Sequence, residues 1–463
     1  MSEPPRLSRR DLLAGFGLRR RLTEAISSSR IPSDAPALVP HVRGLAELSQ
    51  ALMEHRLAPA DVMGEVASRV QARESTAGPF TALRDPEALM ELALDAEYAI
   101  NMGGYRGRLH AMPFVVADSF AAADPLRAEP ATAGSLARLN AAGAILIGTT
   151  RVIGEDVDGP HDSRNADPAW ERGHMPTAAA VESGLAAAGL ATDTAGWVRE
   201  AAGLVGIVGL KPTYGRISRA ELTPVAWSLD HVGILTRSVE DAALVLNALA
   251  GPDAGDSTAA PFPAPDFTAS LHRPIAEWRI GVPPAHLIDR HHPDVHRAYF
   301  GALDRLATLG AVVVEVPLPG SFEPAAAAHA LIELVEQSTA LLSALRDGAA
   351  GELSASTRAR ILAGTLVDPD AYERAQRVRA MAIRELRALL VDVDVLATPA
   401  QETVMGGTAS GALEFRTIFN LTGFPALVVP VAATGLPVGI QLITRPFEEA
   451  TILTVGEAVA AAR

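Results

Sequence analysis

LATDTAGWVREAAGLVGIVGLKPTYGR, residues 190–216, is the stretch that decides the fold of this chain. It is rich in glycine and alanine, and its second half, GLVGIVGLKPT, has the apolar run of a buried strand with glycines at its ends. Loops of small residues usually let another group approach the backbone, so the indole of Trp197 in the middle is unexpected. Lys211, in the same stretch, is the only lysine among 463 residues. Both oddities bear on function.

Composition limits the classes of protein that this chain can belong to. Apolar residues make up 48% of the sequence and charged residues 20%, which is typical of a globular chain with a large core. The net charge of −14 argues against non-specific binding to nucleic acid or to an anionic membrane. With no cysteine, the chain has no disulfide, no thiolate metal site and no cysteine nucleophile. We expect no cofactor and no metal.

The N-terminus begins like an export signal but does not continue as one. SRRDLLAGFGLRR resembles a twin-arginine signal, but its apolar run, residues 12–18, is short and three arginines follow it. No apolar run reaches the ~18 residues of a membrane span. We therefore expect a basic arm over residues 1–35 and a cytoplasmic protein.

Helix and strand patterns alternate outward from the central stretch. DPEALMELALDAEYAIN, residues 85–101, predicts a helix with Asp85 as N-cap, and residues 178–190 predict an alanine-rich helix. SVEDAALVLNALAG predicts a helix capped by Ser238, and long helices are expected within 322–390. Buried strands are predicted in MPFVVADSF, AAGAILIGTT, RIGVP, AVVVEVPLP, VDVLATP, PALVVPV and GIQLIT. The alternation predicts the α/β class, with a mostly parallel sheet between helices in a single domain over 36–463.

Several long segments resemble the amidase signature family in order and spacing. They are LHAMPFVVADSF, the segment 191–219, SLDHVGILTRSVEDAALVLNALAG and PALVVPVAATGLPVGIQLITRPFEEATIL. The resemblance covers residues 40–463. It implies a large mixed, mainly parallel β-sheet flanked by helices on both faces. It also implies amide hydrolysis by a lysine base, a first serine on a cis peptide in a GGSSGG loop, and a nucleophilic serine in TDTGGSIR.

The three catalytic positions of that family carry other residues in this chain. LHAMPFVVADSF aligns without gaps and puts Ala117 at the lysine position. TDTAGWVR puts Trp197 at the nucleophile, and the family's interval between its serines leads back to Gly173, in ERGHMP. The surrounding scaffold residues are retained: Asp118, Asp193, Thr194, Gly196 and Arg199. A serine amidase needs a deprotonable hydroxyl and a base within hydrogen-bond reach, and losing such a set costs on the order of 10⁶ in turnover.

Trp197 has two interpretations at this position. It either fills an abandoned pocket, where a buried indole stabilises the fold, or forms a stacking platform for a flat ligand. The second interpretation predicts a site for a small amide or carboxylate ligand, lined by Asp193, Thr194, Ala195, Gly196, Trp197 and His174.

Three histidine or acidic clusters could carry other chemistry. His174 is either a new general base beside the altered loop or a solvated loop histidine. Residues 154–162, GEDVDGPHD, are either a hard-cation site or an acidic surface loop, and their spacing fits no EF-hand. RHHPDVH, residues 290–296, is either a metal site or a helix start with Asp294 near the N-cap.

Two functions follow from these observations. In the first, the chain is a pseudo-amidase that acts by binding a ligand or a partner, as one half of a homodimer or as part of a hetero-complex. In the second, it is a divergent enzyme with a rebuilt active site, either an atypical amide hydrolase or a catalyst of acyl or amide chemistry, with His174 as candidate base.

Overall fold

The computed structural model describes residues 44–74, 79–120, 134–151, 176–346, 355–405, 413–431 and 435–462. These residues all belong to the unit His41–Arg463. The predicted arm 1–35, Gly173, His174 and the acidic segment 154–162 lie outside them. The predicted division into an arm and one domain over 36–463 stays a prediction.

An 11-stranded sheet forms the centre of this unit, in the order β1-β3-β2-β4-β6-β5-β10-β11-β9-β7-β8. The strands are β1 (Phe80–Leu83), β2 (Pro113–Ala117), β3 (Ile145–Thr150), β4 (Ala188–Thr192), β5 (Val208–Lys211), β6 (Val232–Thr236), β7 (Arg279–Val282), β8 (Val312–Glu315), β9 (Val395–Pro399), β10 (Ala426–Pro430) and β11 (Gly439–Ile443). Parallel pairing runs through β3-β2-β4 and through β9-β7-β8. The remaining six of the ten pairings in the described part of the chain are antiparallel.

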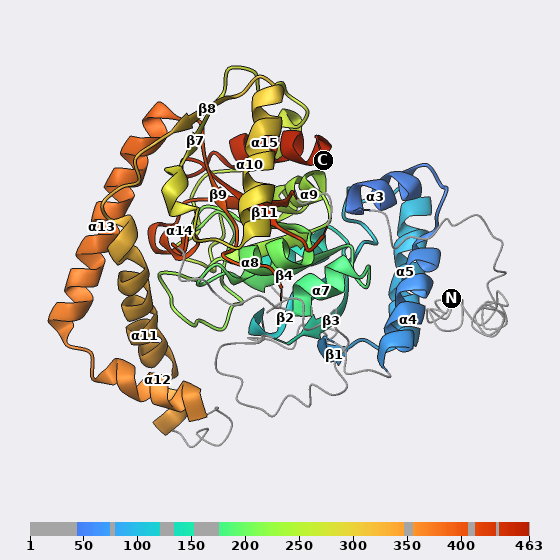
Figure 1. Cartoon of the computed structure of the whole chain (residues 1–463). Coiled ribbons are helices and arrows are strands. Elements are labelled where there is room, and N and C mark those ends of the chain that lie inside the picture. The colour runs from blue at the N-terminus through green and yellow to red at the C-terminus, as the bar shows by residue number, and fades with distance from the viewer. Residues whose placement is uncertain are drawn as a thin grey trace, which may run out of the picture. The chain divides into compact units, whose positions relative to one another are not determined.

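Helices cover both faces of this sheet (Figure 1). On one face, α8 (Trp197–Val205) packs so closely on β5 that a Cβ at Gly209 would lie 2.6 Å from Ala202. On the other face, α15 (Glu449–Ala461) approaches β10, where a Cβ at Gly456 would lie 2.5 Å from Leu427. The expected large mixed sheet between two helical layers is therefore confirmed.

The remaining helices complete these layers and one edge of the unit. Near α8 lies α7 (Pro176–Glu182), and near α15 lies α9 (Val239–Leu249). The others are α3 (Leu45–Met53), α4 (Pro59–Glu74), α5 (Pro86–Asn101), α6 (Gly134–Ala141), α10 (Pro293–Thr308) and α14 (Thr417–Thr422), with the 3-10 turns η2 (Asp118–Phe120), η3 (Phe267–Ser270) and η4 (Ala285–Leu287).

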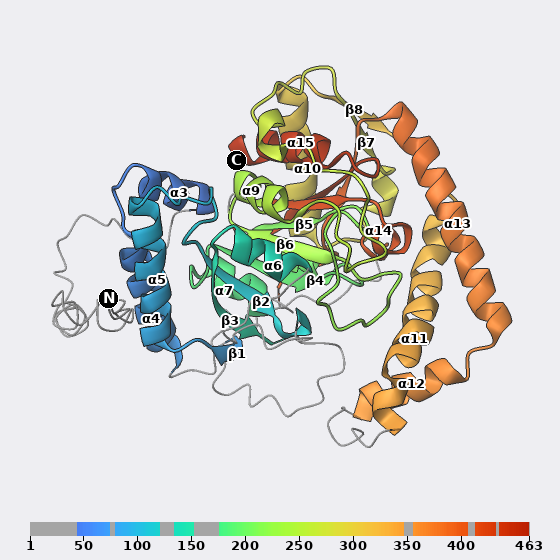
Figure 2. The same cartoon turned by 180° about the vertical axis from the view of Figure 1, so that it is seen from behind.

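A separate helical group stands beside the sheet in both views (Figures 1 and 2). It consists of α11 (Phe322–Arg346), α12 (Ala355–Thr365) and α13 (Pro369–Asp392). Gly364 lets α12 cross α11 closely, since a Cβ there would lie 2.4 Å from the Leu334 carbonyl oxygen. Among the described residues, no helix is both long and apolar enough to cross a membrane.

Three predictions about helix starts are confirmed. Asp85 accepts a hydrogen bond from the Glu87 amide at the start of α5, and Ser238 accepts one from the Asp241 amide at the start of α9. The third is the helix start with Asp294 near the N-cap. At α10 the N-cap is His292, two residues before Asp294, and the His292 ring nitrogen accepts from the Asp294 amide.

Two predictions around the central stretch are wrong. The helix predicted over 178–190 ends at Glu182, and a strand, β4, begins at Ala188. Gly184, with φ of +72°, ends that helix, and pairing with β2 and β6 overrides the helix propensity of the alanines that follow. Trp197 lies in no loop, because it is the first residue of α8.

Candidate functional site

The candidate site begins where two parallel strands end side by side. Ala117 is the last residue of β2, and the neighbouring strand β4 ends at Thr192 and leads into the turn 193–196. Ligand sites of open α/β sheets form at such carboxyl ends. The fold therefore places positions 117 and 197 at the carboxyl ends of these neighbouring strands.

Gly196 shapes the turn that presents Trp197. Its φ of +92° is a left-handed conformation that favours glycine, and a Cβ there would lie 2.5 Å from the Arg416 Cβ. Trp197 follows as the first residue of α8 and packs, partly buried, against the hydrophobic core. The indole therefore has core contacts, as a pocket-filling side chain would.

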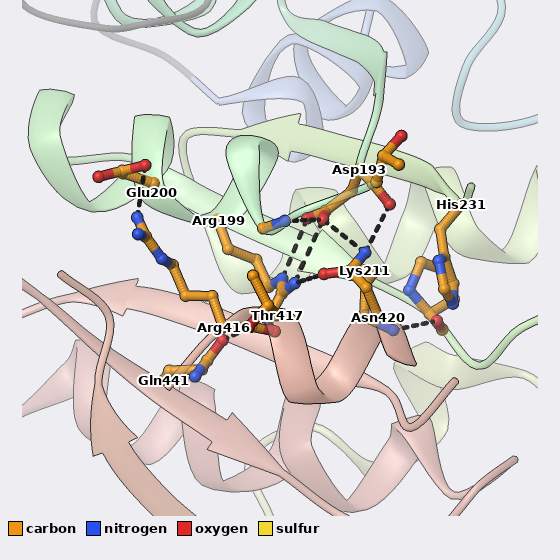
Figure 3. Close-up of polar contacts among 12 residues, drawn as sticks. Asp193, Arg199, Glu200, Lys211, His231, Arg416, Thr417, Asn420 and Gln441 are labelled. Carbon is orange, nitrogen blue, oxygen red and sulfur yellow. Dashed lines mark hydrogen bonds and ion pairs between the residues drawn. The ribbon is translucent and has the colours of Figure 1, made fainter. Parts of the chain in front are cut away.

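A buried network holds this turn from behind (Figure 3). Asp193 accepts from the Gly196 amide at 2.8 Å and from Arg199 Nε at 3.0 Å, and both side chains are fully buried. Arg199 also donates to Asn420 Oδ1 and, at 2.6 Å, to Gln441 Oε1. Asn420 in turn donates to the Asp193 carbonyl oxygen at 2.6 Å. The network ties the turn to α14 and β11.

Electrostatics in this network favour an ionised Asp193. Burial by itself would raise the pKa of Asp193, but Arg199, Lys211 and Asn420 together outweigh burial and hold the pKa below its usual value. Both carboxylate oxygens of Asp193 are occupied by Arg199, Gly196 and Asn420. The sequence predicts Asp193 in the lining of a ligand site. In this structure its side chain binds the Gly196 amide and Arg199 and stabilises the turn.

The single lysine is buried, and its side chain bonds to backbone carbonyl oxygens. Lys211 ends β5, is fully buried, and donates from Nζ to the carbonyl oxygens of Phe424 at 2.6 Å and Pro212 at 3.3 Å (Figure 3). Burial, followed by repulsion from Arg199, lowers the pKa of Lys211 well below its ordinary value. The structure thus gives Lys211 a packing role at the strand end.

Hydroxyl groups on β3, α7, β4 and the turn after β2 form two hydrogen-bonded pairs. Thr150, opposite Ala117 in β3, lies 2.6 Å from the Thr177 hydroxyl and donates to the Val116 carbonyl oxygen at 3.3 Å. Thr192 donates to the Ser119 hydroxyl at 3.3 Å. The hydroxyls therefore have hydrogen-bond partners among themselves, and the side chain of Ala117 offers no polar atom to them.

Two side chains that no sequence pattern singles out bond to Thr194, one to its hydroxyl and one to its carbonyl oxygen. Asp230 accepts from the Thr194 hydroxyl at 2.7 Å and from the amides of Val225 and Ala226. His329, on α11, lies with Nε2 2.8 Å from the Thr194 carbonyl oxygen. Burial raises the pKa of Asp230 to about 6.

Arg416 flanks the start of α8. It pairs with Glu200 at 2.5 Å and with Glu414 at 2.8 Å, and its Cβ packs against Gly196. Burial raises the pKa of Glu402 nearby, whereas the pKa of Glu414 is lowered because Arg416 and Thr417 outweigh burial. The N-terminus of α8 is therefore bordered by a charged cluster.

The histidines of the 290–296 segment take separate positions. His291 is buried against Phe415, His292 caps α10, and His296 lies 3.8 Å from Asp289. In the part of the chain that is described, no group of three or more histidine, aspartate or glutamate side chains is placed to hold a metal ion. Gly173 and His174 lie in the segment 152–175, outside that part.

Comparison with known proteins defines the class of protein. The Amidase family model matches residues 177–453. The A subunit of the glutamyl-tRNA(Gln) amidotransferase of Chloroflexus aggregans is 34% identical over 474 aligned positions, covering 90% of this chain and 96% of the relative. The chain therefore belongs to the Amidase family.

Solved structures agree with this assignment. One described as an amidase superposes with a TM-score of 0.76 at 29% identity, covering 90% of this chain and 99% of that one. A second, from a vestigial protein complex that reveals the origins of an s-triazine catabolic enzyme, superposes with a TM-score of 0.77 at 27% identity, covering 90% and 98%. The fold inferred from the sequence resemblance is thus confirmed.

Proposed function

We propose that this chain is a non-hydrolytic member of the Amidase family, a pseudo-amidase that acts by binding a ligand or a partner protein. The observation that carries the proposal is the identity of two residues at the carboxyl ends of β2 and β4. Ala117 stands at the family's lysine position and Trp197 at its nucleophile. Neither side chain can take up a proton or attack a carbonyl.

The surroundings of these positions support the proposal. Lys211 is the only lysine in the sequence, and its Nζ is bonded to two backbone carbonyls. The hydroxyls beside Ala117 are paired with each other. Removing the members of a nucleophile–base set leaves only ~10³–10⁴ of acceleration over water, from binding and the oxyanion hole.

The binding role has two forms. A small amide or carboxylate ligand would use the turn 193–197 with Trp197 as its platform, and His174 would be part of this site. Alternatively, Trp197 fills the pocket and the chain works within a larger assembly. The Chloroflexus aggregans relative is named as one subunit of an amidotransferase, which supports a role in a hetero-complex. A homodimer is the alternative.

An enzyme with a rebuilt site is the second candidate. The names of its relatives favour this candidate, since they include an amidase and one component of an amidotransferase. Its candidate base is His174. His329, the histidine that the structure places at the turn, has its Nε2 occupied by the Thr194 carbonyl oxygen, so it is not a free base.

A serine-directed fluorophosphonate probe tests the proposal on the full-length protein. We expect no labelling and no hydrolysis of simple amides, while an intact serine amidase assayed in parallel reacts. Combining Ala117→Lys, Gly173→Ser and Trp197→Ser should restore weak hydrolysis that no single change restores, because the groups act as a unit. Labelling of a serine whose replacement abolishes amide hydrolysis would refute the proposal.

A further inference from the structure

We propose that two copies of this chain pair through α12, with the two α12 helices packed antiparallel against each other. The inference is independent of whether the site at Trp197 is hydrolytic. In both views α12 lies at the end of the helical group formed by α11, α12 and α13 (Figures 1 and 2). We call the face of α12 that points away from α11 its outer face.

The inner face of α12 is fixed against α11. Ile361 is buried there, and its carbonyl oxygen accepts from the Ser338 hydroxyl at 2.8 Å. Arg360 donates from Nε to Gln337 Oε1 at 3.0 Å. Gly364 allows the close crossing of the two helices. Because these contacts hold α12 in one position, its outer face needs little ordering before a partner binds.

The outer face of α12 is apolar although it is exposed. Leu362 and Leu366 are 54% and 84% exposed. The helical spacing places three further exposed residues on the same face, and all of them are alanines: Ala355, Ala359 and Ala363. Apolar residues on a helix face are normally packed against another element. A contiguous exposed apolar face of this kind marks an interaction site.

The order of small and large side chains identifies the occupant as a second copy. A contact between two identical faces requires a surface that is complementary to itself. In an antiparallel pair, Ala355 lies opposite Leu366 of the second copy. In the same register, Ala359 lies opposite Leu362 of the second copy, because both pairs of residues share one midpoint. Each leucine therefore meets an alanine that leaves room for it, as close packing demands.

The outer face also brings no like charges together. Its five residues are all uncharged, although the chain has a net charge of −14. Pairing at this face therefore avoids the repulsion that juxtaposed like charges would cause.

The contact is small, so we expect a reversible dimer. α12 has 11 residues and is therefore about 16 Å long. One pair of such helices buries less than the ~1,200–2,000 Å² of a standard interface. A Kd for dimerisation of about 10–100 μM is the corresponding expectation.

Sedimentation of the full-length protein between about 1 and 300 μM tests for the dimer. We expect the monomer to give way to a dimer as the concentration rises, with no larger species. A chain that is still monomeric at about 300 μM contradicts the proposal. If that monomer binds phosphatidylcholine vesicles through Leu362 and Leu366, the occupant is a lipid surface and the assignment to a second copy is wrong.

Matched variants locate the contact. Leu362→Ala with Leu366→Ala should weaken dimerisation about tenfold or more. The control pair is Tyr98→Ala with Met102→Ala on α5, which removes side chains 66% and 68% exposed and should leave the dimer unchanged. Equal effects of the two pairs would overturn the proposal. All four side chains are exposed, so the variants should fold, and circular dichroism checks this.

A variant that adds apolar surface separates specific packing from simple adhesion. Ala359→Leu should weaken the dimer, because the added side chain occupies the space of Leu362 of the second copy. Non-specific association predicts the opposite, since the exposed apolar area becomes larger. Stronger association of Ala359→Leu would therefore refute the antiparallel pairing.

Disulfide formation measures the register, because the chain has no cysteine of its own. In Ala359→Cys the two thiols lie about 4.5 Å apart along the helix pair, within reach of a disulfide. In Ala355→Cys they lie about 16 Å apart along it and cannot be bridged. We expect a covalent dimer on mild oxidation of the first variant only. Equal cross-linking of both variants would mean parallel pairing or random collision, and either result contradicts the proposal.

Discussion

Two parts of the molecule lie at the carboxyl ends of β2 and β4 but differ in chemistry. One is the hydrogen-bond network around Asp193, and the other is the pair of positions 117 and 197. In the network, Asp193 and Arg199 are fully buried and are held by charge-assisted and amide hydrogen bonds. Ala117 is buried and its side chain has no polar atom, and Trp197 packs on the core. The difference shows that the turn 193–196 is held by the hydrogen bonds of Asp193, Arg199 and Asn420. The geometry of the site therefore does not depend on the groups that would act on a substrate.

Breaking the network should have the largest effect on stability. Arg199→Met removes the guanidinium and leaves the Asp193 carboxylate buried without its charge partner. We expect the free energy of unfolding, measured with urea, to fall by about 3–5 kcal/mol. Arg297→Met is the control, because its side chain is 78% exposed and pairs only at the surface with Asp294, and we expect a change within about 0.5 kcal/mol. A loss below about 1 kcal/mol at Arg199 would mean that the turn is held by something else.

Replacing Trp197 tests whether its indole fills a pocket or forms a ligand platform. If the indole fills the pocket, Trp197→Ala should destabilise the fold by about 2–4 kcal/mol, since its packing against the core is lost. Trp227→Ala serves as the control, because Trp227 is 50% exposed and should cost less. A Trp197→Ala variant as stable as the wild type would favour the ligand platform instead.

The sequence could predict most of the sheet and part of the network. Long apolar runs predicted β2, β3, β5 and β7–β11, and the retained scaffold residues pointed to Asp193 and Arg199. β4 was missed because AGLAT has small side chains, so its strand conformation comes from the neighbours β2 and β6.

The residues that complete the site have no local signal in the sequence. Asn420 and Gln441 are 221 and 242 positions from Arg199, and His329 is 135 positions from Thr194. Their partners are neighbours only because the fold brings β11 and α14 beside α8, and α11 against the turn. Sequence spacing cannot reveal such contacts without the topology.

Asp230, which binds Thr194 in the turn, should make the stability of the protein depend on pH. Burial raises the pKa of this carboxyl to about 6 in the folded protein, above the ordinary value of 3.8. The folded state therefore binds more protons than the unfolded state between about pH 4 and 6, so this group lowers stability as the pH rises through that window. Above the window the cost should be constant, at about 3 kcal/mol.

Urea unfolding at about pH 4.5 and pH 7 measures this effect in the wild type and in Asp230→Asn. The amide keeps an oxygen to accept from Thr194 but does not titrate. We expect the variant to gain stability relative to the wild type as the pH rises between these two values. The same difference between the two proteins at both pH values would contradict a shifted pKa at Asp230.

Replacing His329 should change the free energy of unfolding least among these variants. His329 and Asp230 bind different atoms of Thr194. His329→Leu removes the group that donates to the Thr194 carbonyl oxygen, and we expect a loss of about 1 kcal/mol. Because Asp230 binds the hydroxyl of the same residue, the two changes should not add. A double-mutant cycle of His329→Leu and Asp230→Asn at about pH 7 should show a coupling energy of about 0.5 kcal/mol or more. Strict additivity would mean that the two side chains hold Thr194 independently of each other.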